Sequence, residues 1–431
     1  MAENTREIVL DSLLVLEKED ILSHKLMKDV LDKYDYLDGR EKAFIKRVTE
    51  GTIERRIELD YYLNSFSSVP VHKMKPFIRN LLRMSVYQIL FLDGVPDSAV
   101  CNEACKLAGK RKFHNLKGFV NGILRNIAKH KKELPLPDEQ QDFTGYLSVK
   151  YSMPEWLVEL WLGEYDRELV ERMLEGLLQI HPVSLRFPTT WNEEQRESLA
   201  EKLRKAGAEV RQSEQLPYIY WLENAEGLQR LPGYAEGNFV VQDISSALAV
   251  EAAGIQAGDF VMDICAAPGG KAMLAAERAK YVLARDVSEK KTAIITENLE
   301  RMGLSNIEVQ VFDATQTDAE YIEKADVLLM DVPCSGLGVM GKKRDIKYRV
   351  SPESLKSIVA LQQEIVEHSW QYVKPGGVLL YSTCTVNPAE NERMAEWIVE
   401  HFPFEEEMHR QIFPGEMEAD GFFFARLRRK E

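Results

Sequence analysis

The chain lacks any apolar run close to the roughly 20 residues that a helix needs to cross a bilayer. Its N-terminal segment, MAENTREIVLDSLLVLEKED, spaces apolar residues helically among acidic ones. It therefore lacks the basic head and the small-residue cleavage site of a secretory signal. Low-complexity tracts are also missing. These absences predict a folded, cytoplasmic protein with no membrane partner.

Cysteine is scarce as well, with five residues in all, namely Cys101, Cys105, Cys265, Cys334 and Cys384. An odd, scattered set in a chain without an export signal indicates reduced thiols in a cytoplasm. Cys101 and Cys105 stand four apart on an expected helix with no matching Cys or His pair nearby. We therefore interpret these two as core residues and expect no metal site.

Positive charge is in deficit, because 55 Lys and Arg face 69 Asp and Glu and leave a net charge of −14. That balance counts against a nucleic-acid partner, but the distribution points the other way. Between Lys106 and Lys132 stand nine basic residues and no acidic one. A second cluster comprises Lys342, Lys343, Arg344, Lys347 and Arg349, opposed only by Asp345. Neighbouring cations decide phosphate binding, so an RNA partner is expected, while a solvated charged face is the alternative for either cluster.

A chain of 431 residues is too long for one ordinary core, so two or three domains are expected. Residues 1–135 show helical periodicity, and Asp97 or Ser98 is the predicted cap of one helix. The polar stretch ELPLPDEQQ reads as a linker. Residues 150–235 mix helix and strand patterns, which predicts a small α/β linker domain without catalytic residues.

Residues 236–431 alternate short apolar strands with helices. The first four strands are predicted to end at Asp263, Asp286, Asp313 and Asp331, and a fifth, VLLYST, precedes Cys384. Strand–helix alternation predicts a doubly wound parallel sheet of the Rossmann-like α/β class. Ligands of such sheets bind at the carboxyl ends of the strands, so the four aspartates are expected to converge on one cleft.

The strongest motif runs from Asp263 to Lys271, DICAAPGGK. Gly269-Gly270 lets the backbone pass close to a ligand, and the helix that follows presents free N–H groups. The spacing of an ATP- or GTP-binding loop is absent. Asp286 is placed to accept from a ribose diol and Asp313 from an adenine amine, which together predict an adenosine-bearing cofactor. An ordinary tight turn is the alternative.

Two thiols follow adjacent strands, Cys334 in DVPCSG and Cys384 in YSTCT. At a strand's carboxyl end beside a helix N-terminus, a lowered thiol pKa is expected. The alternative for each cysteine is a small buried hydrophobe. Gly336-Leu-Gly-Val-Met-Gly341 matches GxGxxG but follows the fourth strand, so we predict a flexible entry loop for a target base and not a nicotinamide site.

Two parts of the chain each resemble a known protein family. VPDSAVCNEACKLA and GFVNGILRNI resemble the NusB family of helical RNA-binding domains, over roughly residues 1–130. DICAAPGGK, DVPCSG and YSTCT closely resemble the RNA 5-methylcytosine methyltransferases of the Sun family, over about 150–431. The combination implies an S-adenosylmethionine-dependent enzyme that acts on carbon 5 of a cytosine in small-subunit (16S) rRNA, with a NusB-like domain at 1–135 and a methyltransferase domain at 236–431.

The resemblance also implies roles for single residues. Cys384 would attack carbon 6 of the cytosine, because carbon 5 is a poor nucleophile until a thiolate has added beside it. Cys334 would help release the product, and a protonated Asp331 would hydrogen-bond to N3. The implied cofactor contacts are Cys265, Ala266, Ala267, Pro268, Gly269, Gly270, Lys271, Asp286, Asp313 and Asp331. A monomer is expected.

The sequence departs from the family at two places. The run Lys343-Arg344-Asp345-Ile346-Lys347-Tyr348 lacks a usual Pro and has Tyr for Trp, and Pro188 stands where Asn is usual. Both changes leave the exact target base open. Transfer RNA as the substrate is one alternative reading, and a catalytically inactive RNA-binding or assembly factor is another. The intact thiols, Gly-Gly turn and aspartates count against inactivity.

Overall fold

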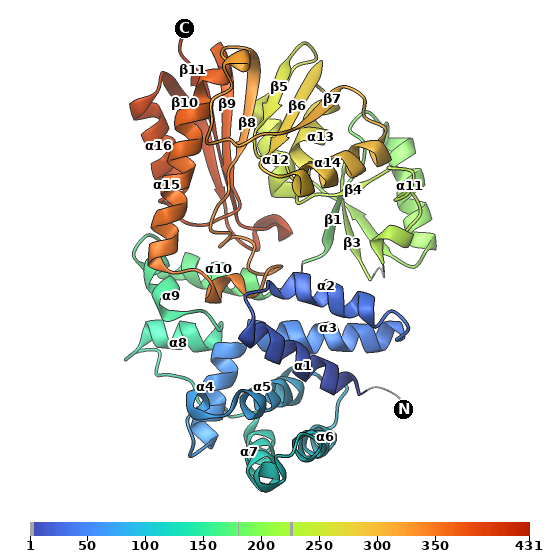
Figure 1. The fold of residues 1–431 in the computed structure, drawn as a ribbon, viewed down its shortest axis with the longest axis vertical. Helices are drawn as coiled ribbons and strands as arrows, with labels where there is room; N and C mark the ends of the chain where they lie inside the picture. Colours follow the sequence, from blue (N-terminus) through green and yellow to red (C-terminus); the bar gives the residue numbers. More distant parts are fainter. Residues whose placement is uncertain (1–3, 180, 225–226) are drawn as a thin grey trace. The chain divides into compact units, whose positions relative to one another are not determined.

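The computed structural model describes residues 4–179, 181–224 and 227–431 (Figure 1). The chain forms two compact units, one of residues 1–175 with 342–349 and the other of residues 176–341 with 350–431. The division into three domains at 1–135, 150–235 and 236–431 stays a prediction. No helix within the described ranges combines the length and apolarity that a bilayer crossing needs.

The first unit is helical, as the sequence predicts. Its helices are α1 (Thr5–Lys18), α2 (Ser23–Lys33), α3 (Gly39–Glu54), α4 (Arg56–Phe66), α5 (Pro76–Phe91), α6 (Asp97–Lys110), α7 (Lys117–His130), α8 (Phe143–Lys150), α9 (Glu155–Leu162) and the start of α10 (Arg167–Leu178). The apolar stripes of α1 and α3 to α7 meet in one core. The predicted cap of α6 is wrong, because Pro96 takes the N-cap position and Asp97 is the first helical residue, without a capping bond.

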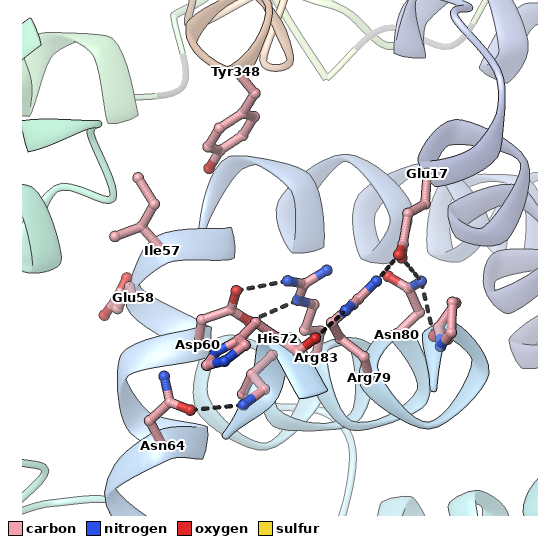
Figure 2. Close-up of polar contacts among 12 residues, drawn as sticks. Glu17, Ile57, Glu58, Asp60, Asn64, His72, Arg79, Asn80, Arg83 and Tyr348 are labelled. Carbon is pink, nitrogen blue, oxygen red and sulfur yellow. Dashed lines mark hydrogen bonds and ion pairs between the residues drawn. The ribbon is translucent and has the colours of Figure 1, made fainter. Parts of the chain in front are cut away.

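Polar side chains join α1, α4 and α5 (Figure 2). Glu17 at the end of α1 accepts hydrogen bonds from Arg79 and Asn80 of α5. Arg83, one turn further along α5, donates twice to Asp60 of α4, with both N–O distances 2.6 Å. A paired guanidinium presents a planar fork that matches a carboxylate, so these contacts fix the relative rotation of the three helices.

The segment 342–349 belongs to this helical unit although it follows the fourth strand of the predicted sheet in sequence. Lys347 is only 3% exposed. Its ammonium donates to the carbonyl oxygens of Glu54 at 2.7 Å and Ser152 at 2.6 Å. Burial lowers the pKa of Lys347 to about 7. The side chain is therefore an anchor between α3 and the end of α8.

Two further cations of this segment, Arg344 and Arg349, are paired. Arg344 donates to Glu54, and Arg349 forms ion pairs with Asp345 and Asp20. Three of the five cations of the second basic cluster are thus buried or paired and hold the segment to α1–α4, whereas Lys342 and Lys343 are exposed. An RNA partner for this cluster stays a prediction, with fewer available cations than its composition suggests.

A cavity of about 380 Å³ lies in the helical unit between the end of α1, α4, α5 and the 342–349 segment. Its charged lining is Glu17, Lys18, Glu19, Asp20, Arg56, Arg83, Asp345 and Arg349. Basic and acidic groups are balanced there, so the cavity favours no single ligand charge.

The second unit contains two sheets. The smaller is antiparallel in the order β2-β3-β1-β4, with β1 (Val183–Arg186), β2 (Glu209–Gln212), β3 (Ile219–Glu223) and β4 (Val240–Val241). Helix α11 (Glu193–Lys205) supplies part of its core. The fully buried Arg186 donates to Glu277, which lies just after α13 (Gly270–Ala276).

The larger sheet has seven strands in the order β10-β11-β9-β8-β5-β6-β7. Its strands are β5 (Phe260–Asp263), β6 (Tyr281–Asp286), β7 (Ile307–Val311), β8 (Ala325–Asp331), β9 (Val373–Thr383), β10 (Phe404–Ile412) and β11 (Phe422–Arg429). The five predicted strands, β5 to β9, are parallel, which confirms the doubly wound class. The sequence reading missed β10 and β11, which add an antiparallel edge.

Helices cover both faces of this sheet (Figure 1). Along β8, Val327 and Leu329 pack with α12 (Ile244–Ala253), α13 and α14 (Glu289–Met302), whereas Leu328 and Met330 pack with α15 (Pro352–Ser369) and α16 (Glu392–His401). Successive strand residues point to opposite faces, so an uninterrupted apolar run is what a strand buried on both sides requires. The carboxyl ends of the parallel strands are left to form the site.

Candidate active site

The two thiols meet at the carboxyl ends of β8 and β9. The strands are parallel neighbours, and Asp331 at the end of β8 pairs in register with Ser382 of β9. Cys334 lies three residues past β8 and Cys384 directly past β9. Their sulfur atoms are 3.1 Å apart. The sequence prediction that the two thiols share a cleft is therefore matched by their geometry.

Beside the thiols, Asp331 is held by two donors. The Lys271 ammonium lies 2.7 Å from one carboxylate oxygen, and the Ser382 hydroxyl donates to the other at 2.8 Å. Burial by itself lowers the pKa of Lys271, but the adjoining Asp331 and Asp263 carboxylates outweigh it and leave that pKa raised. Lys271 is thus a cation between the Gly-Gly turn and the end of β8, with Asp331 accepting.

The turn after β5 brings the backbone to the same edge. Gly269 has a φ of +105° directly before α13, a conformation that side chains with a Cβ rarely adopt. A Cβ on Gly269 would also stand 3.2 Å from Ile295 of α14. Local geometry therefore requires glycine here, which leaves the backbone from Cys265 to Lys271 open at the sheet edge.

Asp263, at the end of β5, is the most unusual group of the site. Its side chain is 1% exposed, and neither carboxyl oxygen has a hydrogen-bond partner among the residues that the structure describes. Burial, followed by the charge of Asp331, raises the pKa of Asp263 to about 7. A buried carboxyl without donors is unfavourable unless a ligand completes its surroundings. The sequence reading placed Asp263 only as a strand end and gave it no role.

The next two predicted aspartates differ from each other in exposure. Asp286 is 3% exposed and accepts from the backbone N–H of Ala267 at 3.0 Å and from Lys291 at 2.9 Å. Asp313 is exposed, two residues beyond β7, and one of its oxygens accepts from Thr315. Both stand at the same edge of the sheet as Asp263.

Two predictions about the loop after β8 are wrong. The pKa of Cys334 is raised, not lowered, chiefly by its hydrogen bond with Cys384 and by burial. No α-helix begins beside this thiol, because the chain continues as a loop. The loop is not a flexible entry either, since residues 336–340 are buried and a Cβ on Gly338 would stand 2.0 Å from the carbonyl oxygen of Gly421.

One residue of the site carried no recognisable signal in the sequence. Glu390 is fully buried between the two thiol loops and accepts hydrogen bonds from both the backbone and the hydroxyl of Ser335. It lies in the polar run before α16, where an acidic residue ordinarily marks a solvated helix start. No group of His, Cys, Asp or Glu suited to a metal ion occurs among residues 4–179, 181–224 and 227–431.

Comparisons with known proteins identify the family of the chain. A family model described as 16S rRNA methyltransferase RsmB/F matches residues 251–428, and the NusB family model matches residues 3–129. A probable ribosomal RNA small subunit methyltransferase B from Bacillus subtilis is 31% identical, over 99% of both chains. The chain belongs to the ribosomal RNA small subunit methyltransferase B family. The Vibrio cholerae member is 29% identical over 94% of both chains.

A solved structure supports the fold. A methyltransferase homologue from Pyrococcus horikoshii covers 66% of this chain and 97% of its own, with a TM-score of 0.57 and 23% identity. Family membership makes the chain an S-adenosylmethionine-dependent methyltransferase of ribosomal RNA with a NusB-like helical front. The resemblance of the front to the NusB family and of the remainder to an RNA methyltransferase family is thereby confirmed.

Proposed function

We propose that the enzyme methylates carbon 5 of a cytosine in small-subunit (16S) rRNA through a covalent bond between Cys384 and carbon 6. The observation that carries this proposal is the 3.1 Å approach of two thiols at the ends of adjacent strands. A methyl transfer to oxygen or to an amine nitrogen needs no thiol, whereas carbon 5 of cytosine needs a nucleophile on the neighbouring carbon first.

The two thiols take different roles. Their hydrogen bond is the largest cause that raises the pKa of Cys334, followed by burial and the charge of Cys384. The raised pKa favours the protonated form of Cys334 in the protein without RNA. Assignment of the attack to Cys384 rests on the family resemblance, because the strand positions alone leave it open.

The proposed reaction balances with these groups. The Cys384 thiolate forms the bond to carbon 6, and the electron pair of the 5,6 double bond moves into the ring, where carbon 5 becomes nucleophilic. Carbon 5 would then bond to the methyl group of S-adenosylmethionine, while the bond from that methyl group to sulfur breaks and its electron pair stays on the sulfur of the departing S-adenosylhomocysteine. Bond formation removes the charge of Cys384, which contributes to the raised pKa of Cys334 after their hydrogen bond and burial. Cys334 then loses its proton to water and, as a thiolate, takes the proton from carbon 5. The carbon–sulfur bond breaks, the double bond returns and Cys384 leaves as a thiolate.

Asp331 is proposed to face N3 of the flipped base. In the protein without RNA it accepts from Lys271 and Ser382, so the proton for N3 has to come through Lys271 or with the substrate. An Asp331→Asn variant with full activity and a flat pH profile would refute this role.

The residues at the strand ends fit the cofactor. S-adenosylmethionine, when bound, supplies an electrophilic methyl group on a positively charged sulfur. The buried, unpartnered oxygens of Asp263 suit a cationic group, and the exposed Asp313 suits an amine donor. Asp286 stands where it can accept from a ribose diol. The proposed contacts from the turn and β8 are Cys265, Ala266, Ala267, Pro268, Gly269, Gly270, Lys271 and Asp331.

The RNA is proposed to bind the helical unit over α6 and α7. Ion pairs engage four of the nine basic residues, namely Lys106, Lys110, Arg111 and Lys131. Among the described residues, the other five have no ion pair, and they are Lys112, Lys117, Arg125, Lys129 and Lys132. Three of these five lie on α7, with Lys112 in the turn before it and Lys132 just past its end, and cations grouped in this way suit a polyanion. A cytoplasmic monomer is part of the same proposal.

The test uses methyl-labelled S-adenosylmethionine and unmodified small-subunit rRNA, with the labelled nucleoside identified after digestion. Label in 5-methylcytidine, abolished by Cys384→Ala, supports the proposal. Cys334→Ala should accumulate a protein–RNA adduct. Cys105→Ala, a partly buried thiol of the helical unit, is the matched control and should keep full activity.

The remaining outcomes favour the rival readings. Label in transfer RNA but not in rRNA keeps the chemistry and changes the substrate. No label in any RNA, with folded protein that still binds the cofactor, favours an inactive RNA-binding or assembly factor.

A further inference from the structure

A buried carboxylate, Glu390, lies between the two thiol loops and has no part in the reaction described so far. It is 0% exposed. Every hydrogen bond to its carboxylate comes from a neutral donor, and no ion pair within the described ranges includes it. Fully buried charges are rare without a cationic partner, so four neutral donors must offset the loss of solvent. A buried carboxylate of this kind indicates that the positions of the groups bonded to it are important.

One side of this carboxylate fixes the backbone around Cys334. The N–H of Ser335, the residue after Cys334, donates to Glu390 at 2.8 Å. Gln362 of α15 donates to the same carboxylate oxygen at 3.1 Å and to the carbonyl oxygen of Pro333, the residue before Cys334, at 2.9 Å. Both neighbours of Cys334 are therefore held by Glu390, directly or through Gln362.

The other side reaches the loop of Cys384. The second oxygen of Glu390 accepts from Asn387 at 2.8 Å and from the hydroxyl of Ser335. That hydroxyl is 2.7 Å from the hydroxyl of Thr385, the residue after Cys384. The network thus continues without interruption from the residue after one thiol to the residue after the other.

We propose that Glu390 is a positioning residue that sets the Cys334 thiol against Cys384 and thereby controls release of the methylated product. The inference rests on the proposed function and adds a residue that does not touch the RNA or the cofactor. The charge of Glu390 also contributes, after Cys384 and burial, to the raised pKa of Cys334. Geometry and charge therefore act on the same thiol.

The first variant is Glu390→Gln. An amide of the same size keeps one acceptor but turns an NH₂ group toward Asn387 or Ser335, so at least one of the four contacts is lost. Misplacement of a reacting group by about 1 Å can lower a rate by about a hundredfold. We expect kcat to fall by about tenfold to a hundredfold, with an unchanged KM for the cofactor. The protein–RNA adduct should accumulate as it does in Cys334→Ala.

A matched control separates positioning from stability. Glu277→Gln removes another buried carboxylate of the same unit, which holds Arg186 and Thr189 away from the thiols. It should lower the thermal stability without accumulating the adduct. If Glu390→Gln behaves like Glu277→Gln, with lower stability and no adduct, Glu390 is only structural and the inference is wrong.

A double-variant cycle tests whether Glu390 acts through Cys334. Adding Glu390→Gln to Cys334→Ala should raise the adduct level no further, because the thiol to be positioned is gone. Additive effects would overturn the inference. If Glu390→Gln does not fold, Ser335→Ala decides, since it deletes one contact and should accumulate the adduct to a smaller extent. No adduct with Ser335→Ala would also overturn it.

Wild-type protein in the same assay separates this inference from the function it rests on. If the wild type forms no 5-methylcytidine, or Cys384→Ala remains active, the proposed function fails. If the wild type is active and dependent on Cys384, the behaviour of the Glu390 variants tests the positioning role alone.

Discussion

Replacement of Asp263 by Asn should have opposite effects on stability and on cofactor affinity. Within the described part of the chain, neither oxygen of the Asp263 carboxyl group has a hydrogen-bond partner, and its side chain is 1% exposed. Burial raises its pKa from 3.8 to about 7. A rise of about 3 pH units corresponds to about 4 kcal/mol of unfavourable free energy for the ionised form in the folded protein.

The sign of the pH dependence follows from where the proton sits. Between pH 4 and pH 7 the folded protein holds a proton on Asp263 that the unfolded chain has released. The free energy of unfolding therefore falls as pH rises through this window, and the loss stays constant above it. Asp263→Asn cannot ionise, so its stability relative to the wild type should rise by about 4 kcal/mol between pH 4 and pH 8.

Urea unfolding followed by circular dichroism at pH 4.5, 6 and 8 measures this difference, and isothermal titration calorimetry measures cofactor binding at pH 8. The variant should be more stable at pH 8 and yet bind S-adenosylmethionine at least tenfold more weakly, because a charge facing a cationic ligand is lost. A stability difference that does not change with pH, or unchanged affinity, would refute the reasoning.

Three further outcomes are expected. The pKa of Lys347 is about 7 in the folded protein, below its usual 10.5, so between these values the unfolded chain binds a proton that the folded protein lacks. The free energy of unfolding should therefore rise from pH 7 to pH 10. Urea unfolding should show this rise in the wild type and not in Lys347→Met. Gly338→Ala should lower the free energy of unfolding by about 3 kcal/mol, because its Cβ meets a backbone oxygen, while Gly94→Ala, with open space around it, should be near neutral in the same melts. Diamide should abolish methyl transfer by joining Cys334 to Cys384, and dithiothreitol should restore it; full activity with two fewer titratable thiols would contradict this.

The sequence predicts the positions of the reacting groups well, for a physical reason. Parallel strands place their carboxyl ends at one edge, so Asp331, Cys334 and Cys384 come together wherever the strand–helix alternation is correctly read. Asp263 could have been found the same way, as the acidic end of the first strand. That its oxygens lack hydrogen-bond donors could not be predicted, because this depends on which groups of the other strands lie nearby in the fold.

Other features depend on contacts between distant residues. No periodicity indicates that Glu390 turns inward to Ser335, 55 residues earlier, instead of capping α16 in solvent. The 342–349 segment reads as a basic patch because composition counts charges without their partners. The strands β10 and β11 were not predicted for two reasons. Exposed acidic residues on β10 hide the alternation of apolar and polar residues, and two consecutive antiparallel strands at the edge depart from the strand–helix alternation.

The two units differ in the charge of their candidate functional surfaces. In the second unit, the carboxyl groups of Asp263 and Glu390 are buried near the thiols, and the partly exposed Asp331 is in contact with the cation Lys271. Such surroundings attract a cationic cofactor and repel the RNA backbone, since charges interact strongly where water is excluded. Attraction of the phosphates must therefore come from elsewhere, and in the proposed function the cations on and beside α7 that have no ion pair among the described residues would supply it. An acidic protein with a net charge of −14 can thus act on RNA, because binding and chemistry rely on surfaces of opposite charge.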